Sequence, residues 1–284
     1  MKKLLLLLLS IALLGMAAVG IAAENSINVK GSDTMVVLGQ KWAEVYMSTN
    51  PTVKIQITGG GSGTGLAALQ NNQVDIANSS RSIKPKEVEQ CIKTFHRKPV
   101  QYVVALDGLS IYVNENNKID TITFSDLRDI FTGKITNWKQ LGGNDCNIVA
   151  YSRENSSGTY EFFKEHVLNG ADFAANVQTL AGTAQIIQSV AMDKTSIGYG
   201  GAAYAKGVKQ LKVAKTKEEG YFAPTEENVM TGKYPIWRNL YIYVNPDLDK
   251  GDVHKYIDWI KSDAGQSVVK TVGYYPIPAN IRTK

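Results

Sequence analysis

Residues 27–46 read INVKGSDTMVVLGQKWAEVY, and this stretch decides the fold class. Apolar and polar side chains alternate over its first four residues, which is typical of a β-strand. A short turn, GSDT at residues 31–34, follows directly. Beyond the turn, apolar residues recur at the spacing of one helix face: Met35, Leu38, Trp42, Val45 and Tyr46. The stretch therefore predicts a strand, a hydroxyl-rich turn and a helix in direct succession.

The same strand, turn and helix unit recurs along the chain. It is expected again over residues 53–70, 74–95 and 146–168, where each strand pattern is followed by glycine or hydroxyl residues and then by a helical pattern. One further strand is predicted over residues 207–215, GVKQLKVAK. Strands that alternate with helices predict an α/β fold with mixed sheets.

Two β-rich runs divide this pattern into two lobes. The first is PVQYVVALDGLSIYVN at residues 99–114, where the chain is expected to cross between lobes near Asp107-Gly108. The second, WRNLYIYVN at residues 237–245, is expected to cross back. The crossings predict a first lobe of residues 24–107 with 240–284 and a second lobe of residues 108–239.

The N-terminal residues 1–23 have the layout of a secretory signal peptide. Two lysines precede an apolar run from Leu4 to about Ala23 that ends in small residues. A membrane anchor is the alternative, because the run nearly reaches the ~20 residues that span hydrocarbon. Polar residues without a basic cluster follow, which favours cleavage of the segment and secretion of the mature chain.

Length, charge and cysteine content bound the function classes. Removal of residues 1–23 leaves about 260 of the 284 residues, enough for two medium α/β domains. It also lowers the formal net charge from +5 to +3, which is too small to indicate a nucleic-acid partner. A disulfide between Cys91 and Cys146, the only cysteines, is chemically possible after secretion, and two free buried thiols are the alternative.

Four turns between strands and helices offer hydrogen-bond donors. In α/β folds such turns gather at the carboxyl ends of strands, where helix N-termini direct free N–H groups into a crevice. Serine and threonine hydroxyls add donors, and Arg81 and Arg153 add charge to two of the turns. Ordinary helix capping can explain any one turn, but the four together favour an oxyanion site. These turns are residues 31–34, 59–65, 78–81 and 153–159.

Patterns typical of enzymes do not fit the sequence. A P-loop would need lysine after Gly65, where Leu66 stands, and a nucleophile elbow around Ser62 would need glycine at Thr64. The sequence contains no HExxH or CxxC pattern and no cluster of histidines that would indicate a metal site. It therefore predicts no catalytic residues, no metal site and no cofactor.

The combination of four sequence motifs resembles a known protein family. They are VKGSDTM at 29–35, ITGGGSGTG at 57–65, DIANSSR at 75–81 and SRENSSGTY at 152–160. They closely resemble the periplasmic phosphate-binding proteins of the phosphate-specific ABC transporter, which are PstS-like substrate-binding proteins. The resemblance implies a type II-like periplasmic binding protein fold, with two mixed-sheet α/β domains joined by two crossing strands. It also implies a periplasmic, monomeric protein that captures inorganic phosphate and delivers it to a membrane permease.

The resemblance further implies which residues bind the anion. Hydroxyl and backbone donors are expected from the first turn and from the glycine-rich turn. The charged contact is expected from Arg153, with more donors from the helix start that follows it. The expected phosphate-binding residues are Ser32, Asp33, Thr34, Ser62, Gly63, Ser80, Arg81, Arg153, Ser157, Gly158 and Thr159.

Two positions depart from the pattern of some family members. Ser80 stands where those members carry an aspartate that accepts a proton from bound phosphate. Asn155 stands where they pair the arginine with an aspartate, so Arg153 is expected to be less neutralised. Asp33 is a candidate for the missing acceptor, because phosphate at neutral pH keeps a proton that sulfate lacks.

Two other functions are alternatives. The same fold could bind a different tetrahedral oxyanion, such as sulfate, molybdate or tungstate. A secreted phosphoester hydrolase with Ser62 or Ser157 as its nucleophile is the second alternative, although no histidine or metal-binding motif accompanies either serine. For the binding protein, closure by hinge motion is expected near Asp107-Gly108 and Asn239-Leu240.

Overall fold

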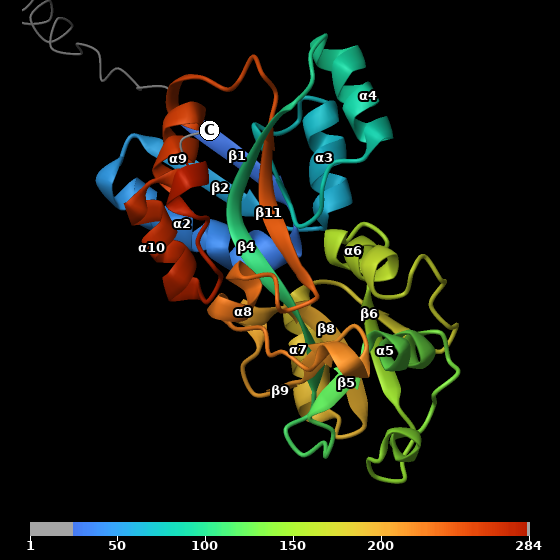
Figure 1. Cartoon of the computed structure of the whole chain (residues 1–284). Coiled ribbons are helices and arrows are strands. Elements are labelled where there is room, and N and C mark those ends of the chain that lie inside the picture. Colours follow the sequence, from blue (N-terminus) through green and yellow to red (C-terminus); the bar gives the residue numbers. More distant parts are fainter. Residues whose placement is uncertain (1–24, 283–284) are drawn as a thin grey trace, which may run out of the picture.

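The structure is a computed structural model that describes residues 25–282. The predicted signal peptide, residues 1–23, lies outside the described residues. Two lobes are stacked one above the other and joined by two long strands, as Figure 1 shows. The two-lobed α/β architecture expected from the sequence is therefore confirmed.

The first lobe is built from the repeated strand, turn and helix unit. Its parallel strands lie in the order β2, β1, β3, with bounds β1 (Asn25–Gly31), β2 (Val53–Thr58) and β3 (Ile76–Ser79). Helices cover both faces of this sheet (Figure 1). One face carries α2 (Val36–Thr49), α9 (Gly251–Lys261) and α10 (Asp263–Val272), and the other carries α3 (Ser62–Gln70) and α4 (Pro85–Phe95).

Two crossing strands continue the sheet from the first lobe into the second. β4 (Val100–Val113) and β11 (Trp237–Val244) pair in an antiparallel arrangement, and the sheet runs from β3 through β11 and β4 to β8. The register of the β4–β11 pair shifts once, between Leu240 and Tyr241. Both predicted crossings are therefore present, while the lobe boundaries at 107/108 and 239/240 stay a prediction.

The second lobe has a shorter sheet flanked by helices. From β4 its strands follow in the order β8 (Ser196–Gly201), β6 (Val149–Arg153) and β7 (Gln178–Leu180). Its smaller strands are β9 (Lys209–Gln210), which pairs with β4, and β5 (Thr121–Thr123) and β10 (Lys212–Ala214), which pair with each other. Its helices are α5 (Phe124–Phe131), α6 (Gly158–His166), α7 (Thr183–Met192) and α8 (Glu226–Met230).

The prediction of one continuous strand over residues 207–215 is wrong. This stretch forms two short strands, β9 and β10, on either side of Leu211. β9 pairs with β4, whereas β10 pairs with β5. Leu211 is fully buried, and its backbone N–H donates to the Ile111 carbonyl oxygen at 2.9 Å. The alternating pattern was right for each half, but a sequence pattern does not reveal a change of partner.

Each lobe buries its own hydrophobic core. In the first lobe, Trp42 of α2 and Ile257 of α9 are buried with apolar residues of the sheet. In the second lobe, Phe131, Phe163 and Tyr199 form an aromatic group. The rings of Phe163 and Tyr199 are stacked at 4.0 Å with only 3° between their planes. Large buried rings of this kind contribute much of the stability of a core.

The two cysteines are free thiols in different parts of the molecule. Cys91 belongs to α4 and is buried against α3 and the sheet of the first lobe, whereas Cys146 is half-buried against the core of the second lobe. Burial raises the pKa of the Cys91 thiol to about 11, with a smaller contribution from Glu87. Of the two alternatives left by the sequence, the structure has separate thiols, and only Cys91 is fully buried.

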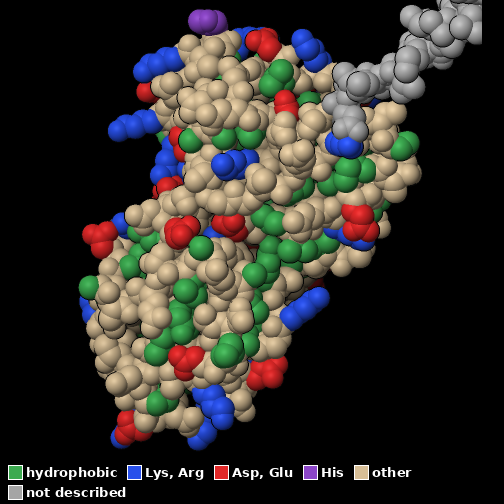
Figure 2. All heavy atoms as spheres, turned by 180° about the vertical axis from the view of Figure 1, so that it is seen from behind, with side chains coloured by type: hydrophobic (Ala, Val, Ile, Leu, Met, Phe, Trp, Pro, Cys, Tyr) green, Lys and Arg blue, Asp and Glu red, His purple; other side chains and the backbone are tan. Residues whose placement is uncertain are grey.

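The surface carries charges of both signs. Figure 2, the view from behind, shows Lys and Arg interspersed with Asp and Glu over both lobes, without a broad region of one sign on that face. Within residues 25–282, no helix combines the length and apolar character needed to cross a membrane.

Phe163→Ala is expected to lower the free energy of unfolding by about 3–5 kcal/mol, because it removes a fully buried ring and leaves a cavity against Tyr199. Chemical denaturation measures this change. Met192→Ala is the matched control, since the Met192 side chain is 79% exposed and its removal is expected to change stability by no more than ~0.5 kcal/mol. Equal losses for the two variants would contradict the assigned core.

Candidate functional site

The first turn lies between the lobes directly after β1. Gly31 ends β1 with φ of +143°, and a Cβ atom there would collide with the Asn78 carbonyl oxygen. Glycine therefore allows the turn to lie against β3. Ser32 donates its backbone N–H to the same carbonyl oxygen at 2.9 Å, and the 3₁₀ turn η1 (Asp33–Met35) follows. The side chain of Thr34 within η1 is consequently held in a buried position.

Two hydrogen bonds join the lobes next to this turn. The hydroxyl oxygens of Thr34 in the first lobe and Thr159 at the start of α6 lie 2.8 Å apart, and both side chains are buried. Gly63 in the first turn of α3 donates its backbone N–H to the Ser156 carbonyl oxygen at 2.9 Å. The structure therefore brings together turns that are widely separated in the sequence.

An ion pair between the lobes adds a buried positive charge to this cluster. Arg153 ends β6, and its Nη2 lies 2.7 Å from Oδ2 of Asp33. Its Nη1 donates to the Thr183 hydroxyl at 3.0 Å, and its side chain is only 1% exposed. The second oxygen of Asp33 accepts the backbone N–H of Gly60 at 2.7 Å. The expectation that Arg153 is less neutralised is wrong, because Asp33 supplies the carboxylate that Asn155 does not.

Three small residues pack closely beside the ion pair. Ser80 donates its backbone N–H to the Ser62 hydroxyl at 3.0 Å, and the two hydroxyl oxygens are 3.4 Å apart. A Cβ atom on Gly158 would collide with the Ser62 hydroxyl and would lie 2.9 Å from the Ser80 hydroxyl. All three residues are buried, so the expected residues of the second and third turns converge on the start of α6.

Ser157 has the ordinary role of a helix cap. Its hydroxyl accepts the backbone N–H groups of Thr159 at 3.2 Å and of Tyr160 at 3.3 Å. Capping satisfies two of the donors that the first turn of an α-helix leaves free. Residues 156–159, SSGT, therefore both cap α6 and place Gly158 and Thr159 beside the other turns.

The guanidinium of Arg81 is engaged by carboxylates and is not directed at this cluster. Two of its nitrogens donate to the two oxygens of Glu87 at 2.7 and 2.8 Å, and its Nε lies 2.6 Å from Glu161 of α6. Burial acts to lower the pKa of Arg81, but these carboxylates outweigh it and leave the pKa raised. Lys84 also pairs with Glu161, at 2.7 Å. Arg81 and Lys84 therefore bind the second lobe to the first.

Sequence analysis missed a second buried ion pair at the crossing strands. Asp107 of β4 and Arg238 of β11 are direct partners in the β-ladder, and both are buried. Arg238 donates to Oδ2 of Asp107 from Nε at 3.0 Å and from Nη2 at 2.8 Å. Nη2 also lies 3.4 Å from the Thr34 hydroxyl. One sequence feature could have indicated this ion pair: each of the two apolar crossing strands contains a charged residue.

Two tyrosines hold the backbone of the first turn. The Tyr204 hydroxyl donates to the Asp33 carbonyl oxygen at 2.8 Å, and the Tyr274 hydroxyl donates to the Thr34 carbonyl oxygen at 2.5 Å. Burial raises the pKa of Tyr204 to about 12, so its hydroxyl stays protonated and remains a donor at neutral pH. These bonds fix the direction of the η1 side chains.

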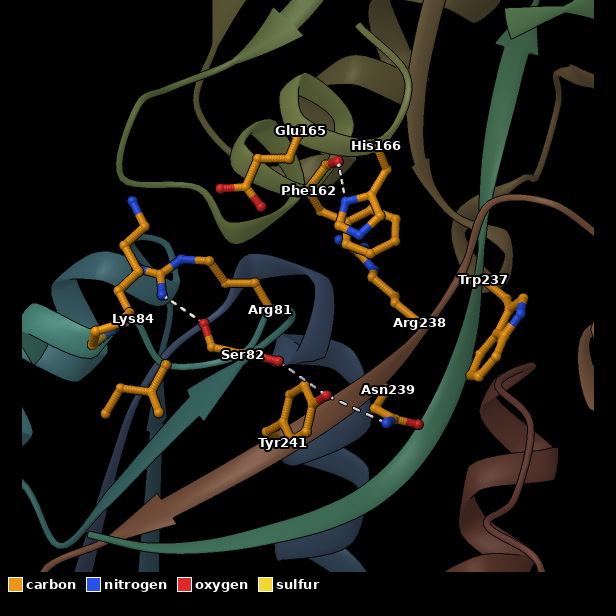
Figure 3. Close-up of a pocket in the computed structure, with 12 residues that line it drawn as sticks. Arg81, Ser82, Lys84, Phe162, Glu165, His166, Trp237, Arg238, Asn239 and Tyr241 are labelled. Atoms are coloured by element: carbon orange, nitrogen blue, oxygen red, sulfur yellow. Dashed lines mark hydrogen bonds between the residues drawn. The ribbon is translucent and has the colours of Figure 1, made fainter. Parts of the chain in front are cut away.

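A hollow of about 420 Å³ lies between the lobes beside this cluster. Figure 3 shows Arg81 and Lys84 on one wall, Phe162 and His166 of α6 on another, and Arg238 between the walls. Other labelled lining residues are Ser82, Glu165, Trp237, Asn239 and Tyr241. Residues 25–282 contain no group of three or more His, Cys, Asp or Glu side chains placed to hold a metal ion.

Most of the chain is similar to phosphate-binding proteins. The family model described as PBP superfamily domain matches residues 18–264. The phosphate-binding protein PstS of Pseudomonas aeruginosa is 33% identical over 278 residues, with 92% of this chain and 86% of the relative covered. PstS of Bacillus subtilis is 34% identical over 256 residues, with coverage of 90% and 82%.

A solved structure agrees with these relatives. It is described as a phosphate ABC transporter substrate-binding protein from Clostridium perfringens with bound phosphate. It superimposes with a TM-score of 0.82 at 29% identity and covers 89% of this chain and 100% of its own. The expected type II-like fold of periplasmic binding proteins is confirmed by this likeness. The chain therefore belongs to the PBP superfamily and, within it, to the PstS phosphate-binding proteins.

Proposed function

We propose that this protein binds inorganic phosphate between its lobes and delivers it to the permease of an ABC importer. The observation that carries the proposal is the direct contact of Thr34 and Asp33 in the first lobe with Thr159 and Arg153 in the second. A small tetrahedral anion held there would receive donors from both lobes. The names of the P. aeruginosa and B. subtilis relatives and the phosphate in the C. perfringens structure support this choice of anion.

Arg153 is suited to bind the anion. Its guanidinium is buried, and water screens a buried charge only weakly. Asp33 and Thr183 engage two of its nitrogens, whereas Nε has no hydrogen-bond partner among the described residues. A buried donor without an acceptor is unfavourable, and an oxyanion would satisfy it. The hydroxyls of Thr34 and Thr159 add donors without adding charge.

Selectivity is proposed to depend on acceptors in the same cluster. Phosphate at neutral pH keeps at least one proton and needs an acceptor, whereas sulfate would place an unprotonated oxygen against it. Asp33 is the only carboxylate that the described residues place on Arg153, and Ser80 is close by with a hydroxyl that can accept. Sulfate, molybdate and tungstate, which carry no proton at neutral pH, would therefore bind less well.

The protein is proposed to be a binding protein and not an enzyme. The Ser62 hydroxyl is used by the backbone N–H of Ser80, and the Ser157 hydroxyl caps α6. Within residues 25–282, neither hydroxyl is hydrogen-bonded to a histidine or carboxylate that could act as its base. The phosphoester hydrolase alternative therefore has no activated nucleophile in this part of the chain.

The location and partners follow from the proposed role. The apolar residues 1–23 are proposed to be a cleaved signal peptide, and the mature protein to work in the periplasm as a monomer without a nucleic-acid partner. The permease that receives phosphate is the proposed macromolecular partner. The lobes are proposed to open and close around the ion by bending at the crossing strands.

Arg153→Ala is expected to weaken phosphate binding by at least ~2 kcal/mol, roughly 30-fold in Kd, because a buried charged partner is lost. Isothermal calorimetry measures the affinity, and thermal unfolding verifies that the variant is folded. Arg97→Ala is the control, since Arg97 is an exposed surface arginine paired with Asp247. Unchanged affinity in a folded Arg153→Ala variant would remove Arg153 from the site.

Asp33→Asn is expected to narrow the preference for phosphate over sulfate by roughly tenfold or more, because it removes a proton acceptor and a negative charge beside Arg153. Competition calorimetry with both anions across pH measures this preference. Asp247→Asn, a change of the same charge at an exposed position, is the control. If sulfate is rejected as strongly as before, Asp33 has no part in selectivity.

Glu161→Gln is expected to speed phosphate release about five- to tenfold with little change in the association rate, because it weakens the pairs of α6 with Arg81 and Lys84 in the closed arrangement. Stopped-flow measurement gives both rates. Glu44→Gln is the control, since it makes the same change of charge in an exposed ion pair with Lys41 within α2. An unchanged release rate would show that these ion pairs do not hold the lobes together.

A further inference from the structure

We propose that Arg238, held by Asp107, is a positioning residue that orients the Thr34 hydroxyl toward the bound anion. The proposal rests on phosphate binding at the interlobe cluster and adds a residue of the crossing strands to it. Neither Arg238 nor Asp107 belongs to the turns that carry the expected site. Their position links the ligand contacts to the two strands along which the lobes are joined.

Asp107 holds the guanidinium of Arg238 through two hydrogen bonds. Two donors, Nε and Nη2, converge on one oxygen of Asp107 at 3.0 and 2.8 Å. The two residues face each other across the β4–β11 ladder, with the Arg238 side chain 2% exposed and the Asp107 side chain fully buried. A charged pair with so little contact with water is not screened, so it is held in one geometry.

The chemistry of the contact with Thr34 is directional. A guanidinium has five N–H donors and no acceptor, so Nη2 can only donate to the Thr34 hydroxyl oxygen, 3.4 Å away. A hydroxyl that accepts from Arg238 must direct its own proton elsewhere. The Thr159 hydroxyl oxygen, 2.8 Å from that of Thr34, marks the direction of the cluster. Thr34 is therefore free to donate on the side where the anion is proposed to bind.

Arg238 also contacts the second lobe. Its guanidinium carbon lies 5.4 Å from the centre of the Phe162 ring in α6, which is within cation–π range. Figure 3 shows the side chain rising from β11 toward Phe162 and His166. Its Nη1 is buried and has no hydrogen-bond partner among the described residues. One cation thus contacts a crossing strand, the first turn and α6.

A double-mutant cycle for phosphate affinity tests the proposal. The variants are Thr34→Val, the neutral pair Asp107→Asn with Arg238→Gln, and the three changes combined. The neutral pair keeps a polar side chain at both positions but no longer supplies the charged donor. We expect it to fold with a Tm close to that of the unchanged protein and to bind phosphate roughly tenfold more weakly. The combined variant should bind no more than about twofold more weakly than Thr34→Val.

The outcomes separate positioning from a purely structural role. If Asp107 and Arg238 only stabilise the fold, a folded neutral pair should bind phosphate as tightly as the unchanged protein. That result would overturn the proposal. Losses that multiply fully in the combined variant would overturn it too, because Arg238 would then not act through Thr34. If the neutral pair does not fold, Arg238→Lys replaces it in the same cycle, because lysine keeps the charge beside Asp107 but lacks the planar fork that reaches Asp107 and Thr34 together.

Phosphate binding by the unchanged protein is measured as the reference, and it separates failure of this proposal from failure of the proposed function. Failure of the unchanged protein to bind phosphate would refute the function itself, and the proposal with it. Normal binding by the unchanged protein together with normal binding by the neutral pair would refute only the role of Arg238. The change Thr34→Ser serves as the rescue control, because it keeps the hydroxyl and is expected to retain most of the affinity that Thr34→Val loses.

Discussion

The ion pair between Asp33 and Arg153 is the interaction on which the arrangement of the cluster depends. It joins the first turn of one lobe to the end of β6 in the other, over 2.7 Å and with little exposure to water. An isolated buried guanidinium would be strongly unfavourable, and Asp33 offsets that cost while Nε of Arg153 keeps no hydrogen-bond partner within residues 25–282. The two partners belong to different lobes, so the pair bridges the boundary between them.

Small residues around the ion pair set its surroundings. Gly31 allows the first turn to lie against β3, and Gly158 leaves room for the hydroxyls of Ser62 and Ser80. Hydroxyl groups can donate or accept, so they adapt to the protonation of a ligand in a way that a second arginine could not. Charge is thus concentrated on a few paired groups, and most of the remaining contacts are neutral donors.

The sequence was sufficient for the fold and for most positions of the cluster, for a physical reason. Strand and helix periods are local, and residues at the carboxyl ends of neighbouring strands meet in any sheet of this kind. Thr34, Ser62 and Ser80 follow the neighbouring strands β1, β2 and β3 and could therefore be expected together, whereas the approach of Thr159 from the second lobe was implied by the family resemblance. Their role as phosphate ligands is still a prediction.

Ion pairs between side chains that are distant in the sequence could not be predicted from these local patterns. Nothing local to Arg153 indicates that its carboxylate comes from Asp33, and nothing local to Arg81 indicates that Glu161 approaches it from α6. Such partners depend on how the lobes face each other, which is a property of the whole fold. The Asp107 and Arg238 pair was missed for the same reason, although a charge inside an apolar strand was a usable sign.

The hydrogen-bonded ladder between β4 and β11 has a mechanical consequence. The lobes are not joined by loose linkers, so separating them must twist or bend a two-stranded ribbon whose backbone bonds stay intact. A deformed ribbon stores elastic energy and returns to its resting shape. The shift of register between Leu240 and Tyr241 is the place where that ribbon is least regular, and a bend concentrated there would cost the fewest bonds.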